Sequence, residues 1–376
     1  MKIAVNTRLL LPGKLEGIGW FTYETLKRIT QNHPEHEFLF LFDRKYSEEF
    51  IFSDNVKPVI VPVQARHPIL FHIWFEWMVP PVLRKHNVDL FLSPDGYLSL
   101  NSEKKQLAVI HDINFEYYPR HLPYAARKYL RYYFPKFAEK ASRIATVSQF
   151  SKEDIIRHYE ADPERIDVVY NGVSEEYKPI SNSEKITARA KFTKGYDYFI
   201  FVGSIQPRKN LTQIFKAFDK FKKDNDTRIK LLIVGEKRWW TKAITRAFDA
   251  MKFKNDVIFT GRLEQEELSI ALAASIALVY VSFFEGFGIP IVEAMNCDVP
   301  VITSNVTSMP EVAGKAGIYV SPFDSNSIKE GMEKAAFDTK LVAQLIEEGK
   351  EQRKKFSWDK TAELLWGSIE KCMNES

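Results

Sequence analysis

Short apolar strands alternate with helical stretches along the whole chain, and this pattern restricts the fold more than any other feature. In the first half the predicted strands are residues 3–6, 38–42, 89–93, 107–110, 144–147 and 166–169. In the second half they are residues 198–202, 230–234, 257–260, 276–281, 301–303 and 318–320. Continuously apolar strands with helices between them are typical of parallel sheets covered on both faces. The sequence therefore predicts an α/β fold.

The strands predict two doubly wound domains, because one sheet of about twelve strands would be unusually wide. The break is expected after the segment Tyr170-Asn171-Gly172-Val173, where residues 175–195 become polar. We expect a first domain at residues 1–175, a linker at 176–196, a second domain at 197–356 and a terminal amphipathic helix at 357–376. The sequence leaves open whether this helix lies on the second domain or crosses back to the first.

Composition excludes several classes of protein. Hydrophobic residues make up 45% of the 376 residues and charged residues 27%, as in globular proteins. A net charge of +4 gives little reason to expect a nucleic-acid partner. Two cysteines, Cys297 and Cys372, are too few for a disulfide framework or a zinc cluster, so we expect a reduced, cytoplasmic setting. The first residues lack the apolar core of a signal peptide, and the uncharged run 268–284 is too short for a membrane span.

Residues 282–301 place two glutamates, Glu285 and Glu293, after a predicted strand. Ligands of parallel α/β sheets bind at the carboxyl ends of strands, so these carboxylates are expected at the binding edge. A helix is expected to follow, and its first amides would point at an anion. The segment that offers these amides is Gly286, Phe287, Gly288 and Ile289. The alternative is a glycine turn with solvated carboxylates.

A second candidate, Arg208-Lys209, follows the predicted strand at 198–202 and precedes a helix. Arginine offers a planar fork and lysine a compact charge, and both suit a diphosphate. The alternative is a solvated basic pair. Basic residues are disfavoured at the amino ends of helices, which favours a bound anion at this position.

The first half offers two candidates at strand ends. Gly17-Ile18-Gly19 precedes a helix expected to begin near Trp20, and such glycines let the backbone approach a phosphate. The spacing is not Gly-x-Gly-x-x-Gly, which disfavours a nicotinamide cofactor, and a simple turn is the alternative. His111 and Asp112 follow another strand, where a histidine binds a sugar hydroxyl or polarises a carbonyl. The alternative is a helix-capping aspartate beside a structural histidine.

Residues 123–143 interleave basic and aromatic side chains, with Glu139 as the single acid. One interpretation is a helix that lies on an anionic membrane surface. The other is an aromatic stripe that faces the core, with a basic outer face. Residues 68–81, with Trp74, Phe75 and Trp77, carry the same ambiguity. No histidine, cysteine or carboxylate pattern predicts a metal site, and no P-loop or nucleophile elbow is present.

Taken in order and spacing, these motifs resemble the retaining glycosyltransferases of family 4, which have the GT-B fold. The second half carries VGSIQPRKN, LLIVGE, GRLEQEEL, EGFGIPIVEAM, PVITSNVTSMPEVAG and GIYVSPFD. The first half matches through the loop at 17–19, the His111-Asp112 pair and the segment at 170–173. The resemblance implies two Rossmann-like domains that face a cleft, with a nucleotide-sugar held mainly by the second domain and no divalent metal or other cofactor.

The resemblance also implies a role for each candidate residue. Arg208 and Lys209 would neutralise the donor diphosphate, and Glu293 would hold the ribose. Glu285 and the amides of residues 286–289 would grip the transferred sugar and the distal phosphate. The loop of Gly17 and Gly19 would close over the phosphates, His111 would contact the sugar, and Leu263 would lie near the base. Glu285, His111 and Asp112 are the candidates for catalysis.

Two positions depart from the family pattern. Ser204 stands where many relatives have arginine, so Arg208 is expected to take over part of that role. Asp298 stands where a glycine is usual, and we expect it to end the helix in a left-handed conformation.

The leading hypothesis is a metal-independent retaining hexosyltransferase, with GDP-mannose as the expected donor. Its acceptor would be a glycan or a lipid-linked molecule of polysaccharide or glycolipid synthesis, reached in the cytoplasm or at the inner face of the membrane. One alternative is a non-hydrolysing nucleotide-sugar epimerase. The other is a non-catalytic protein that binds an anionic surface through residues 123–143.

Overall fold

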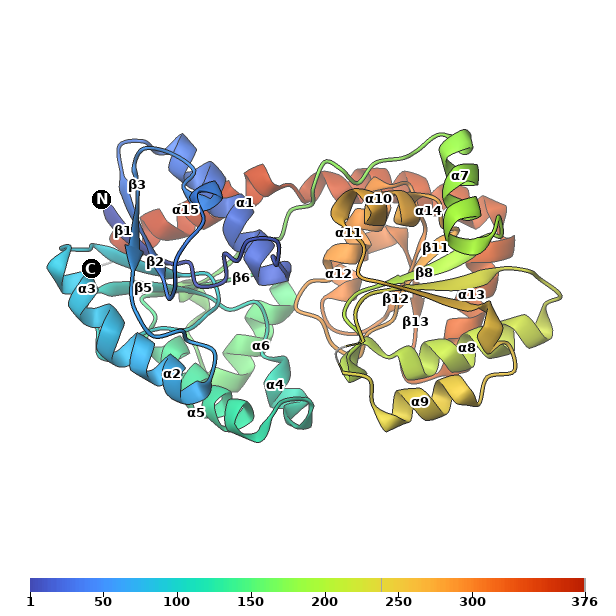
Figure 1. Cartoon of the computed structure of the whole chain (residues 1–376), viewed down its shortest axis with the longest axis horizontal. Coiled ribbons are helices and arrows are strands. Elements are labelled where there is room, and N and C mark those ends of the chain that lie inside the picture. Colours follow the sequence, from blue (N-terminus) through green and yellow to red (C-terminus); the bar gives the residue numbers. More distant parts are fainter. Residues whose placement is uncertain (238, 375–376) are drawn as a thin grey trace. The chain divides into compact units, whose positions relative to one another are not determined.

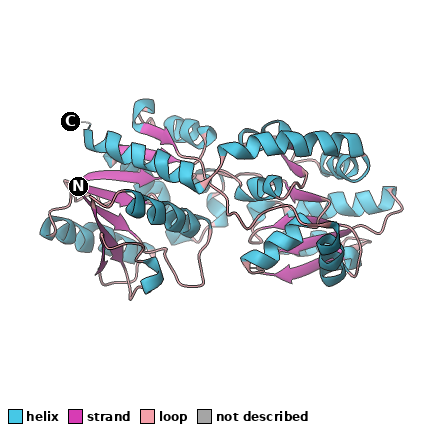
Figure 2. Cartoon of the chain, turned by 90° about the horizontal axis from the view of Figure 1, so that it is seen from above, coloured by secondary structure: helices cyan, strands magenta, loops and turns pink. Residues whose placement is uncertain are grey.

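The computed structural model describes residues 1–237 and 239–374. These residues form two compact units. The first contains Met1–Gly172 together with the terminal helix that begins at Trp358, and the second is Val173–Phe356. In each unit a parallel sheet lies between layers of helices (Figure 1, Figure 2).

In the described residues of the first unit, the sheet has seven parallel strands in the order β3-β2-β1-β4-β5-β6-β7. The strands are β1 Lys2–Asn6, β2 Glu37–Phe42, β3 Val56–Ile60, β4 Leu90–Ser93, β5 Lys105–Val109, β6 Arg143–Thr146 and β7 Ile166–Val168. In the described residues of the second unit, six parallel strands follow the order β10-β9-β8-β11-β12-β13. They are β8 Tyr198–Val202, β9 Lys230–Val234, β10 Val257–Gly261, β11 Ala277–Tyr280, β12 Val301–Ser304 and β13 Gly317–Val320.

The helices of the first unit are α1 Gly17–Asn32, α2 Pro68–Ile73, α3 Val79–Lys85, α4 Asn114–Tyr117, α5 Tyr124–Lys140, α6 Gln149–Tyr159 and α15 Trp358–Asn374. A π-helical turn, Trp74–Met78, joins α2 to α3. The helices of the second unit are α7 Asn182–Thr193, α8 Leu211–Asp224, α9 Lys242–Asp249, α10 Gln265–Ala273, α11 Ile289–Asn296, α12 Met309–Ala313, α13 Ser325–Phe337 and α14 Thr339–Gln352.

Each sheet buries both faces, which explains why its strands are apolar throughout. In the first unit, Trp74, Leu83 and Phe137 of the α2–α3 and α5 layer pack against one face of the sheet. Helices α1 and α15 pack on each other, and α15 contacts β5 and β6. In the second unit, Phe218 of α8 and Met332 of α13 belong to the core on one face. These cores position the carboxyl ends of the strands, where the candidate residues lie.

Helix α15 packs on the first unit rather than on the second. Thr361 Oγ1 donates a hydrogen bond to the carbonyl of Tyr170 at 2.7 Å. A Cβ atom at Gly172 would lie 2.3 Å from the Trp358 nitrogen, so only glycine permits this crossing.

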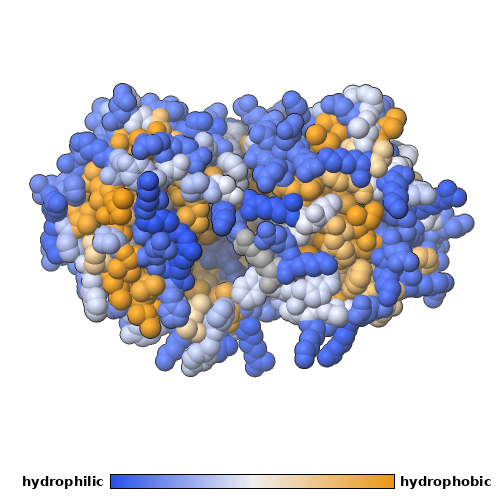
Figure 3. All heavy atoms as spheres, in the orientation of Figure 1, coloured by the Kyte–Doolittle hydropathy of each residue, from blue (hydrophilic) through white to orange (hydrophobic). Residues whose placement is uncertain are grey.

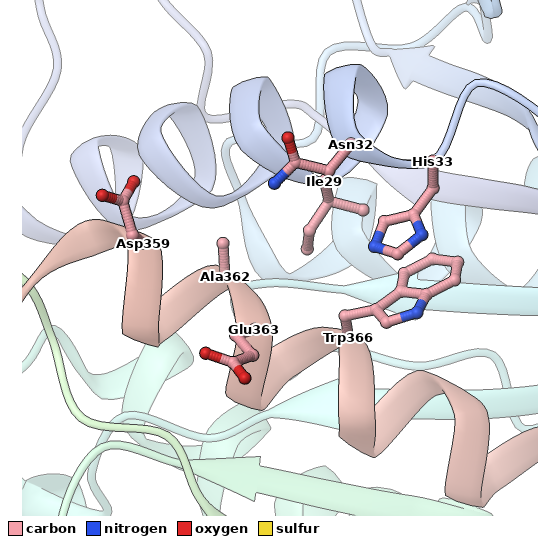
Figure 4. Close-up of a pocket in the computed structure, with 7 residues that line it drawn as sticks. All are labelled: Ile29, Asn32, His33, Asp359, Ala362, Glu363 and Trp366. Atoms are coloured by element: carbon pink, nitrogen blue, oxygen red, sulfur yellow. The ribbon is translucent and has the colours of Figure 1, made fainter.

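A cavity of about 370 Å³ opens between α1 and α15 (Figure 4). Ile29 and Ala362 line its apolar part, and Asp359 lines its polar edge. His33 stacks on Trp366 there, with ring centroids 3.6 Å apart.

The predicted α/β fold with two Rossmann-like domains is confirmed, and each predicted strand occurs within two residues of its expected ends. Three details differ. Strand β3 was not predicted, because Pro58 weakens the strand pattern; the sheet tolerates this proline because β3 is an edge strand. Helix α7 lies inside the segment predicted as a linker, where Ser181 and Glu184 form a capping box. Helix α1 begins at Gly17 and not near Trp20.

Candidate active site

Glu285 forms ion pairs with two basic side chains, Arg208 and Lys209, at the carboxyl ends of neighbouring strands in the second unit. Arg208 and Lys209 lie in a 3₁₀ turn, Pro207–Lys209, that follows β8, while Glu285 follows β11. Arg208 Nη1 lies 2.7 Å from Glu285 Oε2, and Lys209 Nζ lies 2.7 Å from Glu285 Oε1. Two positive groups and one carboxylate leave an excess of one positive charge at this edge of the sheet.

Burial strengthens these ion pairs. Glu285 and Lys209 are both buried. Burial alone would raise the pKa of Glu285, but the Arg208 and Lys209 cations outweigh it and hold that pKa at about 2. The carboxylate is therefore ionised over the whole physiological pH range, and it fixes the position of both cations.

The turn that carries the two cations is tied to the sheet by Asn210. This residue has a φ of 64°, which asparagine tolerates better than most residues. Its side-chain amide donates to the carbonyls of Val281 at 2.9 Å and Pro322 at 2.8 Å. As the sequence predicted, Arg208 and Lys209 lie between a strand and a helix, in the turn that precedes α8, which begins at Leu211.

Sequence reasoning missed Tyr280, the last residue of β11. Its hydroxyl oxygen accepts a hydrogen bond from Lys209 Nζ at 2.5 Å, and the ammonium lies 4.6 Å from the ring centroid. Burial, with the Glu285 charge next, raises the pKa of Tyr280 well above its usual value. An aromatic residue in an apolar strand looks like core, and only the position of Tyr280 at the carboxyl end of β11, where ligands of parallel sheets bind, could have pointed to a polar role.

The loop from Glu285 to Gly288 is held by residues that follow β12. Ser308 Oγ donates to the carbonyls of Glu285 at 2.8 Å and Phe287 at 3.0 Å. Gly286 is buried in this loop, and Phe287 packs edge-on against Phe356 with centroids 5.4 Å apart. The loop therefore forms part of the packed unit and is not a solvated turn.

Gly288 caps helix α11 in a left-handed conformation with a φ of 100°. A Cβ atom there would lie 3.2 Å from Ile291 Cδ1 and 3.4 Å from Tyr280 Cε1, so glycine also avoids crowding. The helix begins at Ile289, and its cap residue has no side chain to occupy the first amides.

Glu293 lies in α11, one turn beyond its start, and is partly buried. Burial raises the pKa of its carboxyl to about 7, while a hydrogen bond from Tyr177 opposes this shift. Tyr177, which sequence reasoning also missed, is buried, and burial followed by the Glu293 charge raises its pKa. Glu293 therefore titrates near neutral pH, unlike Glu285.

Two glycines allow close packing of the backbone beside the turn that carries Lys209. Gly203 and Gly235 follow β8 and β9 with φ values of 141° and 146°. A Cβ atom at Gly235 would lie 2.0 Å from the Gly203 carbonyl oxygen, and one at Gly203 would lie 3.7 Å from Lys209 Cε. Ser204 is partly buried next to them, and Leu263, also partly buried, follows β10 beyond Gly261.

The other candidates belong to the first unit. Gly17 and Gly19 form the first turn of α1, and a Cβ atom at Gly19 would lie 3.2 Å from the Leu9 carbonyl. His111 Nε2 donates to the Pro94 carbonyl at 2.8 Å. Since a carbonyl only accepts, Nε2 carries the proton and Nδ1 is the acceptor nitrogen of the neutral ring. Burial lowers the pKa of His111, which favours this neutral form.

Asp112 Oδ1 accepts a hydrogen bond from the Asn114 amide at 2.9 Å, at the start of α4. This is a local Asx turn that leads into α4, whose N-cap residue is Ile113, so Asp112 holds the loop without capping the helix. His111 remains beside it, at the carboxyl end of β5.

The expected left-handed conformation of Asp298 is confirmed by its φ of 53°. Its carboxylate accepts a hydrogen bond from Arg353 Nη1 at 2.8 Å, and the same Nη1 donates to the Met295 and Asn296 carbonyls at 2.7 and 3.0 Å. Asp298 thus orients the arginine that caps the carboxyl end of α11.

Comparison with known proteins decides the family. The model described as Glycosyl transferases group 1 matches residues 182–352, and the model described as Glycosyltransferase Family 4 matches residues 15–177. The O-antigen chain mannosyltransferase RfbU of Salmonella typhimurium is 30% identical over 287 residues, covering 75% of this chain and 76% of the relative. The chain belongs to this family of glycosyltransferases.

Other relatives agree with this family. The O-antigen chain mannosyltransferase B of Escherichia coli is 27% identical over 357 residues, which cover 92% of this chain and 93% of the relative. The crystal structure of Anabaena HepE in complex with UDP and glucose has a TM-score of 0.76 at 18% identity, over 99% of this chain and 100% of HepE. The crystal structure of WaaG, a glycosyltransferase involved in lipopolysaccharide biosynthesis, has a TM-score of 0.72 at 17% identity, over 96% of this chain and 97% of WaaG. These structures support the GT-B fold, and the family supports an enzyme over a non-catalytic binding protein.

Across residues 1–237 and 239–374, no group of three or more His, Cys, Asp or Glu side chains is arranged to hold a metal ion. No helix in the same residues is both long enough and apolar enough to cross a membrane.

Proposed function

We propose that this glycosyltransferase transfers a hexose from a nucleotide-sugar to a glycan or lipid-linked acceptor, with retention of anomeric configuration and without a divalent metal or other cofactor. The observation that carries the proposal is the cluster of buried Lys209 and Glu285 with half-buried Arg208, which has one excess positive charge. The leaving group is a nucleoside diphosphate, and preorganised positive charge is the largest source of stabilisation for the charge that it develops.

Each residue has a defined task in this proposal. Arg208 and Lys209 bind the diphosphate, and the first amides of α11 add partial positive charge. Glu285 holds both cations in place and accepts hydrogen bonds from the transferred sugar. Glu293 accepts hydrogen bonds from the ribose hydroxyls, and Leu263 lies against the base.

The residues of the first unit act on the sugar and the phosphates. Gly17 and Gly19 present the amides of the first turn of α1 to the phosphates. Neutral His111 contacts the sugar through its acceptor nitrogen, and Asp112 supports the loop that carries this histidine. No covalent nucleophile is assigned.

The proposed donor is GDP-mannose, and the proposed pathway is polysaccharide assembly. Both relatives with the O-antigen names are mannosyltransferases, and they align with most of this chain. The Ser308–Met309–Pro310–Glu311–Val312 segment resembles bacterial mannosyltransferases, and its serine holds the loop at Glu285.

The test is a thermal-shift screen of nucleotide-sugars followed by an assay for released nucleoside diphosphate. We expect GDP-mannose to raise the melting temperature more than UDP-glucose, and Lys209→Ala to abolish this rise while the exposed Lys223→Ala keeps it. Activity is expected to survive EDTA, and NMR of the product is expected to show the donor's anomeric configuration. Equal shifts with both donors contradict the mannose assignment, and isomerisation of the donor without acceptor contradicts transfer itself.

A further inference from the structure

Helix α5 divides its aromatic residues between the core and the surface. Tyr129, Phe134 and Phe137 are buried in the first unit. Tyr124 and Tyr132 are 69% and 56% exposed. The core-facing aromatic stripe predicted from the sequence is therefore present, but it leaves two tyrosines on the outer face that the core does not explain.

The exposed aromatic face continues from α5 onto the neighbouring α2–α3 layer. The Tyr132 ring lies 4.9 Å from the Tyr133 ring, and the Tyr133 hydroxyl and His72 Nδ1 are 3.1 Å apart. His72 in turn lies 5.9 Å from Trp77, which is 61% exposed. Ile69 of α2 is 65% exposed, and Figure 3 shows orange apolar side chains over α2. The contacts connect Tyr132 of α5 to Trp77 across the surface of the first unit, and Ile69 is exposed on the same α2–α3 layer.

Cations lie beside these rings, and two nearby carboxylates, Glu76 and Glu116, already have partners in the first unit, whereas Glu139 of α5 is exposed. Lys136 Nζ lies 3.7 Å from the Tyr132 centroid, and Arg127 lies 5.2 Å from that of Tyr124. Lys128 is also exposed on α5. By contrast, Glu76 is buried and accepts hydrogen bonds from two backbone amides, at 3.0 and 2.9 Å. Glu116 pairs with Arg131 at 2.8 Å.

We infer that this basic aromatic surface, formed by Ile69, Trp77, Tyr124, Lys128, Tyr132 and Lys136, docks on a bilayer that contains anionic lipids. Tryptophan and tyrosine prefer the depth of the lipid headgroups, where one end of the side chain is apolar and the other is hydrated. Lysine near an anionic leaflet contributes about 1 kcal/mol per residue. The surface combines both kinds of side chain and lies in the first unit, apart from the ion cluster in the second.

The lysine charges and the exposed apolar side chains would act together in binding the bilayer. A few lysines alone would bind any polyanion, and their attraction would vanish at high salt. Exposed Trp77 and Ile69 add apolar area that insertion among lipid headgroups would bury. Docking here would place a lipid-linked acceptor next to the first unit, although the docking itself does not depend on the proposed donor or reaction.

The experiment is co-sedimentation of the full chain with vesicles of phosphatidylcholine, alone or mixed with phosphatidylglycerol. We expect binding to the mixed vesicles only, decreasing as salt is raised. The double variant Lys128→Glu/Lys136→Glu is expected to reduce binding at least tenfold, and Trp77→Ala several-fold. The matched control Lys223→Glu/Lys254→Glu makes the same charge change on exposed residues of the second unit and is expected to keep binding within about twofold.

The outcomes separate docking from misfolding and from the proposed function. Circular dichroism and the melting temperature of each variant should match those of the wild type, and GDP-mannose should still shift that temperature. Equal binding to both kinds of vesicle, or an equal loss in the control variant, overturns the inference. If dextran sulfate displaces the vesicles while Trp77→Ala binds them normally, the partner is a soluble polyanion, and the inference is also wrong.

Discussion

The ammonium nitrogen of Lys209 lies 2.5 Å from the hydroxyl oxygen of Tyr280, in the buried interior of the second unit. Because lysine only donates, the tyrosine oxygen accepts this bond and its own proton is available to a carboxylate. Lys209 also pairs with Glu285 at 2.7 Å, and burial, with the Glu285 charge next, raises the pKa of Tyr280, so the tyrosine keeps its proton beside the ion pair. The ion cluster therefore depends on a side chain that belongs to the strand itself and cannot move independently of the sheet.

Removing this hydroxyl should slow transfer without unfolding the protein. In Tyr280→Phe, Lys209 keeps Glu285 but loses its second oxygen partner, and a hydrogen bond to a charged group contributes about 1.5–3 kcal/mol. We expect kcat/KM to fall roughly tenfold. The control is Tyr198→Phe, which removes a buried hydroxyl that donates to the Ala271 carbonyl at 2.6 Å. An equal loss of activity in both variants would show that Tyr280 only stabilises the fold.

Replacing Glu285 by glutamine should affect both activity and acid stability. The variant leaves buried Lys209 and half-buried Arg208 without their counter-ion, so we expect about 3 kcal/mol of destabilisation at pH 7. Transfer should fall about a hundredfold, as when one electrostatic group is removed from an active site.

The pH dependence of the same variant gives an independent test. The pKa of Glu285 is held at about 2 in the folded protein, compared with 4.5 for an ordinary glutamate. Because the pKa of Glu285 is lower in the folded protein, its ionised carboxylate stabilises the fold at pH values above about 4.5. This contribution is lost as the pH falls from about 4.5 to 2. Urea unfolding of the wild type and Glu285→Gln should therefore show a free-energy difference that shrinks over this interval. A constant difference contradicts the ion-paired state.

Much of the fold was predictable because strands that are buried on both faces of a sheet appear in the sequence as continuous apolar runs. Strand β3 was missed because its sequence, VKPVI, contains a proline that only an edge position accommodates. Helix α7 was missed because its composition is polar and its signal lies in a capping box, Ser181 with Glu184, rather than in an apolar stripe.

The site was predictable in part, and for a different reason. Charged residues at strand ends, such as Arg208 and Glu285, stand out against apolar strands. Tyr280 and Tyr177 do not, since a tyrosine in an apolar context looks like core until its hydroxyl partner is known. Which cation pairs with which carboxylate also depends on strand order, and one sequence does not supply that order.

Glu293 should make stability depend on pH in the direction opposite to Glu285. Its folded pKa is raised to about 7 from 4.5, so the folded state favours the protonated form. Stability is then greatest below about pH 4.5, declines as pH rises to about 7, and is constant above that value. Glu293→Gln does not titrate, so its melting temperature relative to the wild type should rise by a few degrees across this interval.

Two comparisons check this prediction. The exposed Glu330→Gln should follow the wild type at every pH, because its carboxylate is not buried. Tyr177→Phe removes the hydrogen bond that opposes the shift and should move the Glu293 transition to higher pH. A Glu293→Gln profile parallel to the wild type from pH 4 to 8 would mean that this carboxylate is not desolvated.

Asp298 should be the position where glycine is better tolerated than alanine. Its φ of 53° is left-handed, which costs a residue with a Cβ atom about 1–2 kcal/mol. Both substitutions remove the acceptor of the Arg353 hydrogen bond, but only alanine retains the backbone strain. We expect Asp298→Ala to unfold at a lower urea concentration than Asp298→Gly, by about 1 kcal/mol in free energy. The control is Asp226, which is exposed and lies outside the left-handed region. There the glycine variant should be less stable than the alanine variant, because glycine increases the conformational entropy of the unfolded chain and relieves no backbone strain in the folded one. If alanine is also the better residue at position 298, Arg353 rather than the backbone sets the requirement for aspartate there.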